Sequence, residues 1–226
     1  MEPKATIFAV LVNLSRPPIV PSDRPPLLVL LHGFGSNEAD LFALAPELDG
    51  RFQIVSLRAP IPLGGPSFAW FRLDWTPNGL VADAAGARQA RDLLVEELDD
   101  LVARLAVDQA RVYLAGFSQG AIVAAAVTLT APEKVAGAAL MSGRVMPEML
   151  PGDAERAKLA GKPIVVTHGT YDDVLPIADG RASRDLLAQL PVDLTYREYA
   201  MGHGVSPECL RDVSTWLGER LDAAGP

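Results

Sequence analysis

The chain has 226 residues, of which 49% are hydrophobic and 21% charged, a composition typical of a folded protein with a sizeable core. Its formal net charge of −8 disfavours nucleic acid or an anionic membrane surface as the main partner, because either would repel an acidic protein. The single cysteine excludes an internal disulfide, and no Cys/His cluster at zinc spacing can be drawn from three histidines, so we expect no metal.

The apolar run near the start, "TIFAVLVNL", is not expected to be a targeting signal. It lacks a net positive charge before it and a cleavage site of small residues after it. The sequence also has no run of about 18 apolar residues that could cross a bilayer. We therefore expect a cytoplasmic protein without integral membrane association, folded as one domain over residues 1–226.

The first part of the chain predicts three strands and a helix. Strands are predicted at 6–13, 27–33 and 52–58, and the second is apolar throughout, as in a strand covered on both faces. A helix is predicted over 37–48, where leucines recur at helical spacing although Pro46 interrupts the pattern.

The next segment, residues 59–81, is rich in proline, glycine and aromatic residues and is too long for an ordinary connection. Long structured loops of this kind often carry function. The residues that follow, 82–107, predict the clearest helix of the chain, because their leucines lie on one stripe and most of their charges lie off it.

Strands and helices then alternate to the end of the chain. Cys209, on the last predicted helix, is expected to be a small buried residue. An alternation of this kind predicts an α/β fold with one mostly parallel sheet and helices on both faces. The predicted elements are strands at 111–117, 135–141, 163–167 and 193–199, and helices at 119–130, about 177–190 and about 207–222.

Ser118 lies between the strand at 111–117 and the helix at 119–130, within the sequence "GFSQG". A G-x-S-x-G match alone is a weak indicator. A strand before it and a helix after it are the setting in which a strained turn exposes a nucleophilic serine. Gly116 and Gly120 would leave room for such a turn.

Residues that suit nucleophilic catalysis follow other strands, where the functional groups of parallel sheets collect. A serine hydroxyl needs a base to take its proton, and the base needs a carboxylate to hold its tautomer. Ser118, an acid at Asp172 or Asp173, and His203 supply these parts in the chain order of α/β-hydrolases.

Backbone amides near the serine are expected to stabilise a developing oxyanion. The amide of Gln119, at a helix start, and that of Phe34, in a glycine-containing loop, are placed to converge. His32 and His168 are expected to order their loops through backbone hydrogen bonds, although His32 could also lie near the oxyanion amides. Trp70 could equally shape an acyl pocket or pin the long loop to the core. His32 and Trp70 are therefore kept as candidate substrate-binding residues.

Four segments, "LLHGFGSNEADL", "GFSQGA", "HGTYDDVLP" and "YAMGHGVSPE", together resemble the phospholipase/carboxylesterase family of α/β-hydrolases. The resemblance covers nearly the whole chain, in order. It implies an α/β-hydrolase fold and self-association such as a homodimer. The compact chain leaves no stretch for a large cap domain, and the triad mechanism needs no cofactor. By the same resemblance Ser118, Asp172 and His203 are the triad, and Phe34 and Gln119 supply the oxyanion amides.

We therefore expect a serine carboxylesterase that hydrolyses small-molecule esters of short to medium acyl chains through an acyl-enzyme on Ser118. One alternative is an acyl-protein thioesterase or lysophospholipase acting on long acyl chains, which a deep apolar groove would favour. A second alternative is a hydrolase-like binding module without turnover. Failure of a fluorophosphonate to label Ser118 would favour that module.

Overall fold

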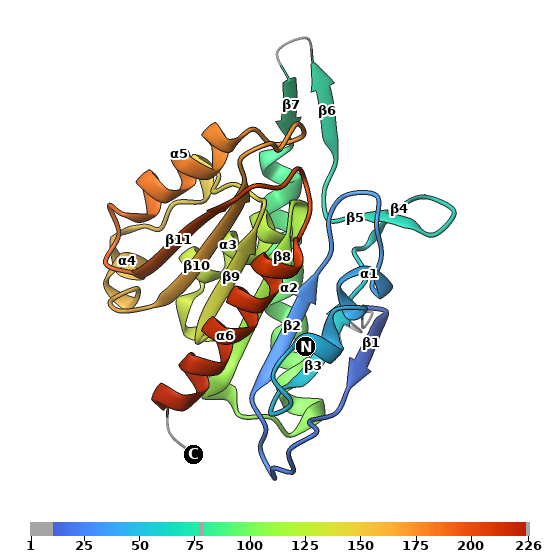
Figure 1. The fold of residues 1–226 in the computed structure, drawn as a ribbon, viewed down its shortest axis with the longest axis vertical. Helices are drawn as coiled ribbons and strands as arrows, with labels where there is room; N and C mark the ends of the chain where they lie inside the picture. The colour runs from blue at the N-terminus through green and yellow to red at the C-terminus, as the bar shows by residue number, and fades with distance from the viewer. Residues whose placement is uncertain (1–10, 77–78, 225–226) are drawn as a thin grey trace, which may run out of the picture.

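A computed structural model describes residues 11–76 and 79–224 of the chain (Figure 1). Within this part, the main sheet is formed by β1 (Asn13–Arg16), β2 (Leu27–Leu31), β3 (Gln53–Leu57), β8 (Val112–Phe117), β9 (Gly137–Met141), β10 (Pro163–Gly169) and β11 (Asp193–Tyr199). The order across the sheet is β1-β3-β2-β8-β9-β10-β11. β1 runs antiparallel to β3, and every other neighbouring pair is parallel.

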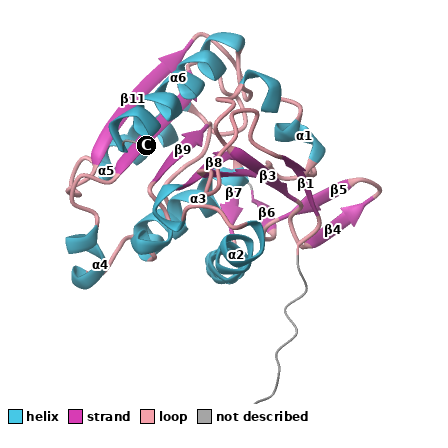
Figure 2. Cartoon of the chain, turned by 90° about the horizontal axis from the view of Figure 1, so that it is seen from below, coloured by secondary structure: helices cyan, strands magenta, loops and turns pink. Residues whose placement is uncertain are grey.

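Helices cover both faces of this sheet (Figure 2). α2 (Ala84–Leu105) and α3 (Gln119–Thr130) lie on one face together with the end of α5 (Ile177–Leu187). α1 (Ala39–Phe42) and α6 (Pro207–Ala224) lie on the other. This arrangement confirms the predicted α/β fold with helices on both faces of a mostly parallel sheet.

The sheet is apolar on both sides because both sides are covered. In β2, Leu27, Val29 and Leu31 pack into the core beneath α2 and α3. Leu28 and Leu30 point the opposite way, into the core beneath α1 and α6. The alternation of side chains along a strand therefore divides one continuous apolar run between two cores.

Two predicted elements differ from the structure. The strand expected at 6–13 falls largely outside the described residues, and its described end is wrong, since β1 begins only at Asn13. Before β1, the amide of Leu11 donates to the Glu97 carboxylate of α2 at 3.1 Å, and the carbonyl of Val12 accepts from the amide of Arg58 at 2.8 Å. The helix expected over 37–48 is broken into α1 and a 3-10 turn at Ala45–Glu47, because Pro46 has no N–H for a longer helix.

The long segment that begins at residue 59 contains two β-hairpins rather than irregular loop. β4 (Ile61–Gly64) pairs with β5 (Ser67–Ala69), and β6 (Leu73–Thr76) pairs with β7 (Gly79–Ala82). Both hairpins extend away from the body of the sheet (Figure 1). Hairpin pairing explains how a segment of this length stays ordered without a place in the main sheet.

The connection from β9 to β10 adds only short elements, a 3-10 turn at Pro147–Met149 and α4 (Asp153–Lys158). They are too small to form a large cap over the sheet edge, in agreement with the expected fold. In the described residues, none of the helices combines the length and the apolar character needed to cross a bilayer.

Candidate active site

Ser118 occupies a sharp turn between β8 and α3. Its φ of 53° and ψ of −115° are unfavourable for a side chain with a Cβ, so the surrounding backbone must hold it there. The turn needs glycine on both sides. A Cβ at Gly116 would lie 2.6 Å from the amide nitrogen of Ala121, and one at Gly120 would lie 2.7 Å from the carbonyl oxygen of His32. This is the geometry predicted from the G-x-S-x-G sequence.

Three side chains from separate loops meet at this turn in one line of hydrogen bonds. The Ser118 Oγ lies 2.9 Å from Nε2 of His203. The other ring nitrogen of His203, Nδ1, lies 2.7 Å from Oδ2 of Asp172. Because a carboxylate only accepts hydrogen bonds, Nδ1 carries the proton and Nε2 is left to accept from the serine hydroxyl. The structure thus brings together the three residues predicted as a triad.

The loop after β10 determines which of the two adjacent acids faces the histidine. Oδ1 of Asp172 accepts hydrogen bonds from the amides of Val174 and Leu175 at 3.0 and 2.8 Å, which leaves Oδ2 for His203. Asp172 is buried, whereas Asp173 is exposed to solvent. The choice that sequence position left open is therefore made by the turn geometry.

His168 stands close to the same acid. It belongs to β10 and pairs with Glu198, so the prediction that the strand ends before it was wrong. Nε2 of His168 lies 2.8 Å from the carbonyl oxygen of Leu175 and 3.5 Å from Oδ2 of Asp172. Because a carbonyl only accepts, Nε2 donates. The expected role of His168 in ordering its loop through a backbone hydrogen bond is confirmed.

The two amides predicted to form an oxyanion hole lie at the same edge of the sheet. The backbone amide of Gln119 belongs to the first residue of α3, and the backbone amide of Phe34 lies in the loop after β2. Within the described residues, neither amide donates to another protein group. The Phe34 loop is attached to β5, because Gly35 donates to the carbonyl of Phe68 at 2.9 Å and Phe68 donates to that of Ser36 at 2.8 Å.

An ion pair next to this loop strengthens the attachment. The guanidinium of Arg58 binds both carboxylate oxygens of Glu38, with Nε to Oε2 at 2.6 Å. It also lies over the ring of Phe68, 4.6 Å from its centroid. The hydrogen bond to Arg58 holds the pKa of Glu38 below its ordinary value, so this carboxylate stays charged at neutral pH. The end of β3, the Phe34 loop and β5 are thus held together.

The two candidate substrate-binding side chains are not exposed. His32 and Trp70 are 0% and 1% exposed, which favours the alternatives of loop ordering for His32 and core packing for Trp70. The backbone hydrogen bonds expected of His32 are present, since Nδ1 lies 2.7 Å from the carbonyl oxygen of Gly33 and Nε2 lies 3.0 Å from the amide of Ala59. Both side chains belong to the core that supports the site.

Sequence analysis missed two features that support the site, the side-chain contacts of Gln119 and the residue Ser142. The side chain of Gln119 is buried and binds the backbone of the 70–71 segment. Ser142, at the end of β9, has a φ of 47° and donates from Oγ to the carbonyl of Gly204 at 3.3 Å, beside His203. The rule that polar residues at strand ends collect at one edge would have identified Ser142.

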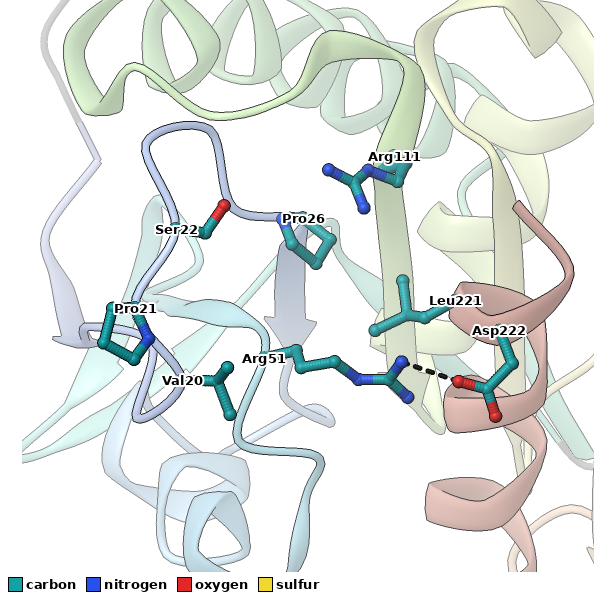
Figure 3. Close-up of a pocket in the computed structure, with 8 residues that line it drawn as sticks. All are labelled: Val20, Pro21, Ser22, Pro26, Arg51, Arg111, Leu221 and Asp222. Carbon is teal, nitrogen blue, oxygen red and sulfur yellow. Dashed lines mark hydrogen bonds and ion pairs between the residues drawn. The ribbon is translucent and has the colours of Figure 1, made fainter. Parts of the chain in front are cut away.

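A cavity of about 510 Å³ lies at the opposite edge of the sheet (Figure 3). Three of its lining residues, Pro26, Arg51 and Arg111, precede β2, β3 and β8 at their amino ends. Arg51 is paired with Asp222 across the cavity at 2.6 Å, as the dashed line in Figure 3 shows. This cavity is therefore separate from the residues around Ser118. In the described part of the chain, no group of three His, Cys, Asp or Glu side chains is placed to hold a metal ion.

Comparison with known proteins finds relatives along most of the chain. Acyl-protein thioesterase 1 of Eremothecium gossypii is 27% identical over 212 residues, which cover 88% of this chain and 89% of the relative. The crystal structure of esterase PE8 is 28% identical, has a TM-score of 0.81 and covers 94% of this chain and 100% of that one. The Bacillus cereus carboxylesterase has the same TM-score and coverage of 94% and 96%, and at 24% identity it supports the fold alone.

The model of the phospholipase/carboxylesterase family matches residues 18–220, which is most of the chain. The matched range includes every residue predicted for the triad and the oxyanion hole. The chain therefore belongs to the phospholipase/carboxylesterase family of α/β-hydrolases and is a serine hydrolase.

Proposed function

We propose that the protein hydrolyses carboxylic esters of short to medium acyl chains through an acyl-enzyme on Ser118. The observation that carries the proposal is the continuous line of hydrogen bonds from Ser118 through His203 to Asp172, with the serine held on a strained turn. A serine hydroxyl with no such base is a poor nucleophile. A purely structural serine would not need a buried carboxylate aligned behind its histidine partner.

In this mechanism Nε2 of His203 takes the proton of the Ser118 hydroxyl as Oγ attacks the ester carbonyl. The amides of Phe34 and Gln119 stabilise the oxyanion that forms. His203 then returns the proton to the leaving alcohol, which departs and leaves an acyl group on Oγ. A water molecule, deprotonated by the same nitrogen, attacks this acyl-enzyme; the bond to Oγ breaks, His203 returns the proton to Oγ, and the acid is released. Asp172 holds the tautomer and stabilises the imidazolium in both halves.

Two exposed aromatic side chains support an uncharged, apolar substrate. Phe34 is 41% exposed in the loop that carries an oxyanion amide, and Tyr171, next to the triad acid, is 72% exposed. Exposed aromatic groups at a site favour contact with apolar groups of a ligand. A small-molecule ester with an alkyl or aryl acyl group meets this requirement.

Long-chain substrates are the second candidate, because the Eremothecium gossypii relative is named as an acyl-protein thioesterase and aligns over most of the chain. A p-nitrophenyl ester series from acetate to palmitate separates the two. A maximum of kcat/KM at short or medium chains supports the carboxylesterase. A maximum at palmitate contradicts the chain-length proposal and favours the thioesterase or lysophospholipase.

The catalytic role of Ser118 is tested in the same assay. Ser118→Ala is expected to lose about 10^3-fold or more of kcat, as when a triad nucleophile is removed. Ser15→Ala, at an exposed serine of β1, is the matched control and is expected to keep wild-type activity. A fluorophosphonate should label the wild type and the control but not Ser118→Ala. Absence of both labelling and hydrolysis in the wild type would leave the binding module as the better hypothesis.

A further inference from the structure

A series of buried hydrogen bonds connects the two amides that are proposed to bind the oxyanion. It begins at the side chain of Gln119, whose Oε1 accepts from the amide of Trp70 at 2.8 Å. Nε2 of the same side chain donates to the carbonyl of Phe71 at 2.8 Å. The residue that supplies one oxyanion amide from its backbone therefore holds a distant segment with its side chain.

The indole of Trp70 makes the next connection. Its Nε1–H donates to the carbonyl oxygen of His32 at 2.9 Å, and the two rings lie with their centroids 5.7 Å apart. Both side chains are buried, so this hydrogen bond is not exchanged with water. The 70–71 segment, which the Gln119 side chain holds, therefore binds His32 in turn. His32 is the residue at which the Phe34 loop begins after β2.

The ring of His32 completes the connection, and its partners determine its protonation. Nε2 faces the amide of Ala59, which only donates, so Nε2 accepts. Nδ1 faces the carbonyl oxygen of Gly33 at 2.7 Å, which only accepts, so Nδ1 carries the proton. Burial lowers the pKa of His32, in keeping with this neutral ring.

The carbonyl that His32 binds belongs to the same peptide unit as the Phe34 amide. Because a peptide unit is planar, fixing the direction of the Gly33 carbonyl also fixes the direction of the Phe34 N–H. The His32 ring therefore orients an oxyanion donor without touching a substrate. Through Trp70 and Gln119, that donor is linked to the second donor at the start of α3.

We propose that His32, Trp70 and the Gln119 side chain are positioning residues that fix the two oxyanion amides relative to each other. The inference rests on the proposed function of the site. Oxyanion stabilisation depends on donors that are already in place when charge develops. Both acylation and deacylation pass through an oxyanion, so a misplaced donor slows both steps by a similar factor. A lower kcat with an unchanged KM is the expected signature.

Trp70→Phe tests the inference, because it removes the indole N–H and keeps an aromatic ring in the core. Trp216→Phe, at a buried tryptophan of α6 on the other face of the sheet, is the matched control. Loss of a whole oxyanion donor costs about 10²–10³-fold in kcat, so a shifted donor is expected to cost about tenfold. KM for p-nitrophenyl butyrate should stay within about twofold. The affinity for phenylboronic acid, which forms a tetrahedral adduct on serine, should fall with kcat.

Gln119→Met, which keeps the side-chain length and removes both hydrogen bonds, repeats the test if Trp70→Phe does not fold. Wild-type kcat and boronate affinity in the folded variant would overturn the inference, as would a raised KM with unchanged kcat. An equal loss in Trp216→Phe would also overturn it, because the effect would then be general to the core. No hydrolysis by the wild type would instead refute the proposed function itself.

Discussion

The close approach of α3 to β2 predicts that Gly120→Ala damages both stability and activity. A Cβ there would lie 2.7 Å from the carbonyl oxygen of His32 and nearer still to that of Leu31. Restoring an ordinary contact of 3.4 Å to the nearer oxygen, that of Leu31, requires about 1.4 Å of separation between two backbones. Neither neighbour is a side chain that could rotate away, so the helix start, the strand end or both must move.

The magnitude follows from two opposing contributions. Overpacking of this kind costs about 3 kcal/mol, and the higher helix propensity of alanine returns about 1 kcal/mol. A net loss of about 2 kcal/mol corresponds to a melting temperature about 4–8 °C lower for a chain of this size. Because the start of α3 carries Ser118 and the Gln119 amide, a shift of this size should also lower kcat/KM by at least about tenfold.

Thermal unfolding and p-nitrophenyl ester hydrolysis measure the two effects. Gly218→Ala in α6 is the matched control, because its nearest neighbours are the ends of the Asp49 and Arg51 side chains at 3.3 and 3.7 Å. The control is expected to melt at or above the wild-type temperature, since alanine favours the helix and those side chains can move. Equal melting temperatures and unchanged kcat/KM for Gly120→Ala would refute the steric reasoning.

Three further predictions concern charge and burial. Asp172→Asn should lower kcat about 10^4-fold because the amide no longer holds the tautomer of His203, and Asp173→Asn should keep wild-type kcat; equal losses would contradict the assignment. The folded-state pKa of His32 lies below 6.5, so its contribution to stability is complete above that pH and is lost as the pH falls through the folded value. Between about pH 7 and about pH 5, the urea midpoint of His32→Gln should therefore fall less than that of the wild type. An equal fall in the midpoints of the two proteins would argue against a neutral buried ring. Burial encloses Cys209 and raises the pKa of its thiol, so a maleimide should modify it only in denaturant, whereas rapid labelling of the native protein would contradict this burial.

Much of the fold was predictable because the spacing of apolar residues along the chain indicates individual helices and strands. The helix at 119–130 and the strand at 193–199 were predicted with the boundaries that the structure has. Elements with weaker local signals were predicted less well. The helix over 37–48 is interrupted at Pro46, and the hairpins within 59–82 gain their order from pairing that no periodicity reveals.

The sequence by itself determined the residue types of the site and the chain order in which they reach one edge of the sheet. The glycines around Ser118 predicted the turn, because only glycine leaves room at both positions. The tertiary structure alone decided which contacts those residues make. His203 and Ser118 are 85 positions apart, and Trp70 and Gln119 are 49 apart, so their hydrogen bonds depend on how the strands are ordered in the sheet. Local chain geometry carries no information about such distant pairs. The sequence therefore left Trp70 open between a pocket and the core, and the tertiary structure buries it against Gln119 and His32.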